Sequence, residues 1–256
     1  ADSGFVVTGQ WRTEARFGDI TFTGTVEDQM NAFVVRYAAD GTPEWAHTFR
    51  SSAPDRSTFI YGLANQADGS VIVGGHAPDS LLMDNTLLTY DEGGAGNISA
   101  WFIAKFNADG SLAWAVDREA SINGAELWDL SVDQAGNIWV GGSIDGTNSN
   151  RLIKFSGADG TVLFTSDPIP GRLARVRITP NGDILLHGIS ANTFAFAGMT
   201  CPYNTALGGS STSWTLRLQA DGTPIWYYAP DQGNSGYPYW GTLCMSASED
   251  GSTYVA

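Results

Sequence analysis

Short runs of alternating apolar and polar residues recur along this chain, and glycine-containing turns separate them. One unit occurs four times: an apolar run, the pair Asp-Gly, and an aromatic residue four positions after the glycine. Because glycine adopts positive φ without steric cost, Asp-Gly between two such runs predicts a β-hairpin. The four copies are Ala32–Trp45, Ala100–Trp114, Arg151–Phe164 and Ser213–Trp226.

A second predicted hairpin alternates with the first, and its turn also contains glycine. Its copies are Ser3–Trp11, Ala67–His76, Ala135–Ser143, Asn181–Ser190 and Asp250–Ala256. All but the first follow a further strand candidate, and these are Phe59–Asn65, Leu127–Asp133, Leu173–Thr179 and Thr242–Ser248. One unit is therefore four strands, a to d, with tight a–b and c–d turns. The b–c connection varies in length over 10–31, 76–99, 143–150 and 190–212.

Four short antiparallel strands repeated along a chain are typical of propeller blades. We therefore predict an all-β fold, a β-propeller of four-stranded antiparallel blades, with about four blades in a single domain over residues 1–256. The predicted repeat units are 1–50, 58–117, 126–166, 173–229 and a partial unit at 241–256.

The order of the strands leaves the completeness of the ring open. The sequence begins with strands b, c and d and ends with a and b, one strand more than four blades need. One interpretation is a fragment of a larger propeller, which an end in mid-strand at Tyr254-Val255-Ala256 favours, because such an end leaves an edge unprotected. The other is a closed ring whose spare strand pairs with a neighbouring molecule.

Composition narrows the class of function. The formal net charge is −14, which disfavours binding to nucleic acid. Apolar stretches such as Trp101–Phe106 are far too short to span a membrane as a helix. Few lysines, many small polar residues and an even cysteine count indicate an exported protein. We expect a Cys201–Cys244 disulfide on that basis, with free core cysteines as the alternative.

Two side-chain types recur at matched positions. Trp45, Trp114, Phe164 and Trp226 follow the Asp-Gly turns, and we interpret them as structural rings that fill the gap between blades. Arg36, Lys105, Lys154 and Arg217 recur in strand c. We expect each base to form a structural ion pair or to bind the carbonyls of a neighbouring blade. A ring of bases around an anionic ligand is the weaker alternative, because it belongs on the innermost strand.

The sequence predicts no catalytic, cofactor-binding or metal-binding residue. His47, His76 and His187 lack the spacing of zinc ligands, and G-x-S-x-G is absent. Calcium is the one cation that acidic turns could bind, at Asp129 and Asp133, at Asp79 and Asp84, or at Asp91-Glu92. Solvated turn carboxylates that bond their own backbone are the preferred interpretation.

The order of these features resembles the bacterial beta-propeller repeat family known as SBBP repeats. The matching stretches are Gly4–Gly9, Phe17–Gly24 and Phe33–Trp45, with Gly69–Gly75 and Trp101–Trp114 nearly as good. The third unit is the weakest copy, because it lacks the excursion and has Phe164 in place of tryptophan. The resemblance implies a secreted or surface-exposed bacterial protein and no shared catalytic motif.

Two functions remain after these exclusions. The first is a non-catalytic extracellular interaction module whose b–c connections recognise a protein or glycan, or which self-associates through open strand edges. The alternative is a carbohydrate-active or other enzyme at the mouth of the central channel. A convergent cluster of acidic residues with raised pKa values would favour the enzyme.

Overall fold

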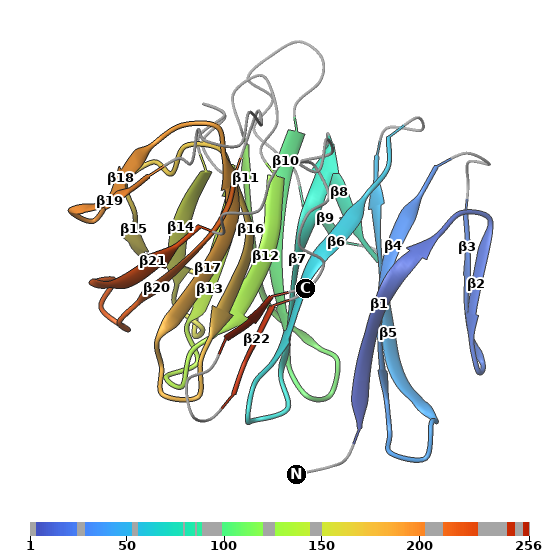
Figure 1. Cartoon of the computed structure of the whole chain (residues 1–256). Coiled ribbons are helices and arrows are strands. Elements are labelled where there is room, and N and C mark those ends of the chain that lie inside the picture. The colour runs from blue at the N-terminus through green and yellow to red at the C-terminus, as the bar shows by residue number, and fades with distance from the viewer. Residues whose placement is uncertain are drawn as a thin grey trace. The chain divides into compact units, whose positions relative to one another are not determined.

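A computed structural model describes residues 4–24, 29–52, 56–78, 80–84, 86–88, 99–119, 126–143, 150–202, 212–229, 245–248 and 253–255. Over these ranges the chain forms antiparallel β-sheets and no helix, which confirms the all-β fold of four-stranded antiparallel blades (Figure 1). In the same ranges no helix has the length and apolar character needed to cross a membrane.

The chain divides into two compact units. Unit 1 comprises Ala1–Leu127 with Ile144–Asn148, and unit 2 comprises Trp128–Ser143 with Ser149–Ala256. Each unit has its own apolar core between two sheets. The single domain and its repeat boundaries stay predictions.

Unit 1 holds two sheets, which we call blades 1 and 2. Blade 1 contains strands b, c and d as β1 (Phe5–Trp11), β4 (Asn31–Tyr37) and β5 (Pro43–Ser51). Blade 2 contains β6 (Phe59–Asn65), β7 (Val71–Pro78), β10 (Ser99–Phe106) and β11 (Leu112–Glu119). Buried Val34 and Phe49 of blade 1 and Val73, Phe102 and Phe106 of blade 2 belong to one core.

Blades 3 and 4 follow the same plan. Blade 3 contains β12 (Glu126–Val132), β13 (Ile138–Ser143), β14 (Asn150–Phe155) and β15 (Val162–Thr165). Blade 4 contains β16 (Arg172–Ile178), β17 (Ile184–Ser190), β20 (Thr212–Leu218) and β21 (Pro224–Tyr228), and unit 2 also holds the pair β22 (Met245–Ala247) and β23 (Thr253–Val255). Trp139 and Leu152 of blade 3 pack with Val176, Leu186 and Trp214 of blade 4.

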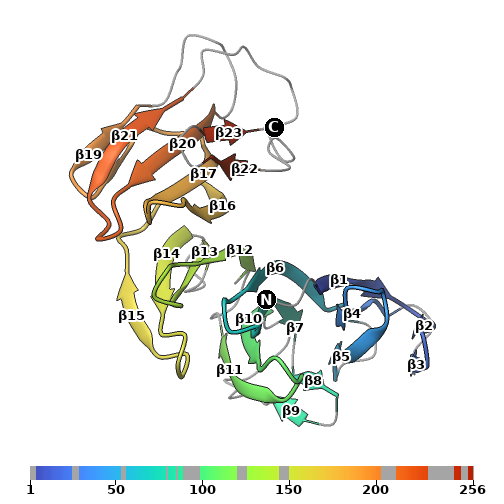
Figure 2. The same ribbon diagram turned by 90° about the horizontal axis from the view of Figure 1, so that it is seen from below.

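The b–c connections contain hairpins that the sequence pattern did not reveal. They are β2 (Glu14–Phe17) with β3 (Ile20–Thr23), β8 (Leu81–Met83) with β9 (Thr86–Leu88), and β18 (Phe194–Phe196) with β19 (Met199–Cys201). The second of these hairpins comes from blade 2 but extends the sheet of blade 1, because β8 pairs with β5 (Figure 2). One outer strand is therefore covered by a short strand from the next repeat.

Candidate functional site

The Asp-Gly turns set the geometry of the repeated polar and aromatic residues. Gly41, Gly110, Gly160 and Gly222 have φ of 84°, 86°, 73° and 90°. The preceding aspartate accepts a hydrogen bond from the backbone N–H two positions later, at 2.9 Å in the pair Asp40 and Thr42. Such hydrogen bonds are the largest cause of the lowered pKa of Asp40 and Asp221. The pKa of Asp109 and of Asp159 is lowered first by the side-chain hydroxyls of Ser111 and Ser156, and then by the backbone N–H groups. These carboxylates stabilise the turns that carry them.

A register shift follows each turn and brings the recurrent base opposite the recurrent ring. In blade 1 the partners change from Tyr37↔Pro43 to Arg36↔Trp45, so that Glu44 is an extra residue. The same shift gives the pairs Lys105↔Trp114, Lys154↔Phe164 and Arg217↔Trp226. The two sequence signals are therefore cross-strand neighbours in all four blades.

The bases contact carboxylates and turn carbonyls. Lys154 Nζ lies 3.0 Å from Asp133 Oδ2, and Arg217 Nη2 lies 2.7 Å from Asp183 Oδ2. Both acids belong to the a–b hairpin of the same blade. The Lys105 charge helps to lower the pKa of Asp68, after larger contributions from hydrogen bonds to Ser70.

Arg36 connects two blades. Its Nε donates to Glu44 Oε2 at 2.8 Å, and its Nη1 donates to the carbonyl of Gly69 at 2.7 Å. Gly69 lies in the a–b turn of blade 2, so this guanidinium links the c strand of blade 1 to the next repeat.

The four aromatic residues differ in burial. Trp45 is 9% exposed, and its Nε1 donates to the carbonyl of Ala108 at 3.1 Å. A Cβ placed on Gly110 would lie only 2.6 Å from Trp45 Cγ, so the ring covers the Asp-Gly turn of blade 2. Trp114 and Trp226 are partly buried, whereas Phe164 is 38% exposed. The expectation of equivalent interior rings therefore fits Trp45 best.

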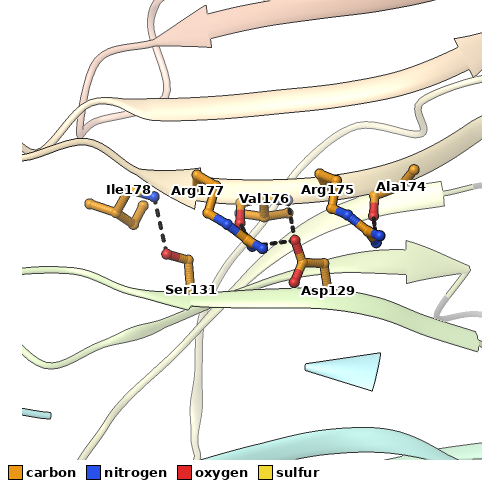
Figure 3. A network of polar contacts seen from close by, with 7 residues as sticks. All are labelled: Asp129, Ser131, Ala174, Arg175, Val176, Arg177 and Ile178. Atoms are coloured by element: carbon orange, nitrogen blue, oxygen red, sulfur yellow. Dashed lines mark hydrogen bonds and ion pairs between the residues drawn. The ribbon is translucent and has the colours of Figure 1, made fainter. Parts of the chain in front are cut away.

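The inner strands of blades 3 and 4 are joined by side chains of β12 (Figure 3). Asp129 Oδ2 accepts from the backbone N–H of Val176 at 3.0 Å and contacts the guanidinium of Arg177. Ser131 Oγ accepts from the N–H of Ile178 at 3.0 Å. These bonds give acceptors to two backbone N–H groups at the edge of β16. Strand β16 is strand a of blade 4, and Arg177 belongs to it.

Asp129 is a structural group and not the solvated turn carboxylate expected from the sequence. It is 4% exposed because it lies within β12, ahead of the turn. Burial raises its pKa, while Arg177 and the Val176 N–H oppose the shift. Its pKa is raised, as the enzyme alternative would require, but its Oδ2 is held by the Arg177 guanidinium and the Val176 N–H.

The other acids suggested for calcium are also engaged where the structure describes them. Asp133 accepts from the backbone N–H of Asn137 at 2.8 Å and from Trp139 Nε1 at 3.2 Å, in addition to Lys154. Burial is the largest influence on its pKa and raises it, but the Lys154 and Asn137 donors together outweigh it. Asp84 accepts from the Thr48 N–H and contacts His47 Nδ1. Asp79, Asp91 and Glu92 lie outside the described residues.

No cluster of three or more metal-binding side chains occurs within the described ranges. Cys201 is buried, and burial raises its pKa to about 11. Cys244 lies outside the described residues, so the predicted disulfide stays a prediction.

A groove lies between blades 3 and 4 in unit 2. It has a volume of about 380 Å³, within the range of ligand sites. Its buried lining residues include Leu152, Phe196 and Leu218, whereas Phe164 and the carboxylates Asp167 and Asp221 are exposed. The remaining lining residues are Thr165, Ser166, Ala197, Gly222, Thr223 and Pro224. The described lining of the groove thus combines an apolar interior with two acids.

Backbone strain occurs on this lining. Ala197 has φ of 47°, a left-handed conformation that costs an alanine about 1–2 kcal/mol, and Gly198 follows at 82°. The two residues form the turn of β18–β19, in which both central positions need positive φ. An Asn-Gly turn would hold the same shape with less strain.

Two histidines that lack a metal-ligand pattern are neutral interior groups. His187 is 4% exposed, and its Nδ1 lies 3.0 Å from Thr215 Oγ1. Burial lowers the pKa of His187 to about 4, with a further contribution from Arg175. Burial also lowers the pKa of His76 to about 4.

These histidines predict a loss of stability in weak acid. Between pH 6.5 and about 4 the unfolded chain binds a proton at His187 and the folded chain does not, so the free energy of unfolding falls as the pH falls. We expect the urea midpoint to decrease over this window, and to decrease less in His187→Gln. Urea titrations at pH 7, 5.5 and 4.5 measure the effect. An unchanged pH slope in His187→Gln contradicts the assignment.

No protein-family model matches the sequence, and no curated protein matches it. The structure is similar to the WD40 β-propeller domain of Doa1, with 10% sequence identity and a TM-score of 0.27, over 88% of this chain and 84% of that chain. The fold assignment is based on the strand pairing within each unit.

Proposed function

We propose that this chain is a non-catalytic β-propeller module of the SBBP repeat type that binds a partner at the surface of a bacterial cell. The sequence features at Gly4–Gly9 and Phe33–Trp45 support the family and, with it, export. An oxidising compartment also suits the proposed Cys201–Cys244 disulfide.

One contrast carries the proposal. The recurrent charged side chains are committed to structure, as Lys154 is to Asp133 and Arg217 to Asp183. Exposed apolar side chains occur on several strands, among them the outer strands β15 and β21, where Leu163 is 54% exposed and Tyr228 is 60% exposed. Such a surface is suited to binding another protein. Exposed apolar side chains on a rigid sheet can bury their apolar surface against a partner without any rearrangement of the fold.

The proposal is tested by location, activity and contact. On intact cells of the source bacterium, added protease should degrade the chain while a cytoplasmic marker survives. The purified chain should hydrolyse no member of a panel of chromogenic glycosides faster than a heat-denatured sample does. Crosslinking to surface proteins, followed by mass spectrometry, should place the links on the outer strands or on the b–c hairpins.

Protection from protease on intact cells contradicts the surface assignment. Sustained turnover of a glycoside contradicts the non-catalytic role and restores the enzyme alternative. Crosslinks scattered evenly over the chain contradict a defined binding surface.

A further inference from the structure

Strand β15 is more exposed than the other strands of blade 3. All four of its residues are exposed, and three are apolar: Val162 at 37%, Leu163 at 54% and Phe164 at 38%. It pairs with β14 on one side and ends the sheet, with no further strand beside it in the part of the chain that the structure describes. An apolar edge strand of this kind is a template for another strand.

The backbone of β15 offers outward hydrogen-bonding groups. The Ser166 N–H bonds the carbonyl of Leu152. Hydrogen-bonded and non-hydrogen-bonded pairs alternate along an antiparallel ladder. Because Leu152 and Ser166 are hydrogen-bonded, the adjacent pair Ile153↔Thr165 is a non-hydrogen-bonded pair. The N–H and C=O of Thr165 therefore point away from β14, toward the open edge.

Blade 1 shows what covers the equivalent strand. Its strand d, β5, pairs along its outer edge with β8, in the register Phe49↔Met83 and Ser51↔Leu81. Leu81 is 0% exposed and Met83 is 3% exposed, so a three-residue apolar strand buries itself there. In unit 2 the hairpin of the corresponding connection, β18–β19, forms a separate two-stranded sheet and leaves β15 uncovered by described strands.

The groove extends this edge and adds chemical selectivity. Phe164, Thr165 and Asp167 belong both to the groove lining and to β15 or its continuation. A side chain of an added strand can enter the apolar interior, beside Phe196 and Leu218. Asp167 and Asp221 then favour a cation next to it.

We propose that β15 and this groove bind an extended segment of another protein by strand addition, a segment with alternating apolar side chains and at least one lysine or arginine. This inference rests on the proposed function and names its partner class. A second copy of the chain is disfavoured, because each copy has a net charge of −14 and like charges repel.

The test uses three capped nine-residue peptides and the full chain. One peptide alternates valine with lysine, one alternates valine with glutamate, and one has the valine–lysine composition in an order without alternation. Fluorescence anisotropy should show saturable binding of the first peptide only. Binding of all peptides alike, or of none, overturns the inference.

Variants locate the site. Thr165→Pro removes the outward N–H and should abolish binding, and Leu163→Lys, an exposed change that leaves the backbone intact, should weaken it about tenfold or more. The double variant Asp167→Asn/Asp221→Asn should weaken the valine–lysine peptide about tenfold. Asp109→Asn is the matched control, because Asp109 occupies in blade 2 the turn position that Asp221 occupies in blade 4, and it should bind as the unmodified chain does.

The outcomes separate this inference from the proposed function. Unchanged peptide binding in both Leu163→Lys and the double aspartate variant overturns the β15 site. Concentration-dependent dimers in light scattering, lost in Leu163→Lys, identify a second copy as the occupant and also overturn it. Surface location and absence of turnover are measured independently, so the function stands or falls on its own data.

Discussion

Replacing Trp45 with alanine should lower the free energy of unfolding by about 3–5 kcal/mol. The ring is 9% exposed and covers Gly110, where no Cβ could be accommodated beside it. Its removal opens a cavity between blades 1 and 2 and leaves the carbonyl of Ala108 without the Nε1 donor. Urea unfolding followed by far-ultraviolet circular dichroism measures the loss.

Phe164→Ala is the matched control for this prediction. Phe164 occupies the same repeat position in blade 3 but is 38% exposed. Its replacement should cost about 1–2 kcal/mol, since this ring packs on Trp139 but is less buried than Trp45 and gives up less apolar burial. Equal losses in the two variants would show that burial does not decide the energetic role of these positions.

Asp129→Ala should also lower the free energy of unfolding, by about 2–3 kcal/mol, because the Arg177 guanidinium is partly exposed and keeps its bond to the Val176 carbonyl. The change leaves the Arg177 guanidinium and the Val176 N–H at the inner edge of β16 without the acceptor that both use. Ser131→Ala is the control on the same strand, and it should cost about 1–2 kcal/mol because only the Ile178 N–H loses its acceptor.

Thermal unfolding of the two variants at pH 7 distinguishes two views of this contact. If Asp129→Ala is no more destabilised than Ser131→Ala, the cost of burying the carboxylate already cancels the gain from Arg177. In that case the Asp129–Arg177 pair would orient β12 and β16 relative to each other without adding to the free energy of unfolding.

The repeat of strands and turns was predictable because its information is local. Asp40-Gly41 specifies its turn through two adjacent residues, and the flanking alternation specifies the strands. The register shift at Glu44 was not predictable, because alternation alone cannot say which residue of strand d is the extra one. The sequence therefore located Arg36 and Trp45 without indicating that they face each other.

The groove was beyond sequence reasoning for a different reason. Leu152, Phe196 and Asp221 come from three separate segments and meet only when blades 3 and 4 pack. Hairpins such as β18–β19 have three residues per strand, too few for a period to be recognised. The positive φ of Ala197 has no sequence signal of its own, whereas an asparagine there would have indicated the turn.

The contacts of blade 1 have a direction along the chain. Arg36 reaches Gly69, β5 receives β8, and Trp45 reaches Ala108 and Gly110, so each contact uses a residue that is translated later. A nascent chain that has released only blade 1 therefore holds an unfinished sheet with an open outer edge and an uncovered indole. These contacts cannot all form until the second c–d turn has left the ribosome, so the stability of one repeat depends on its successor in the chain.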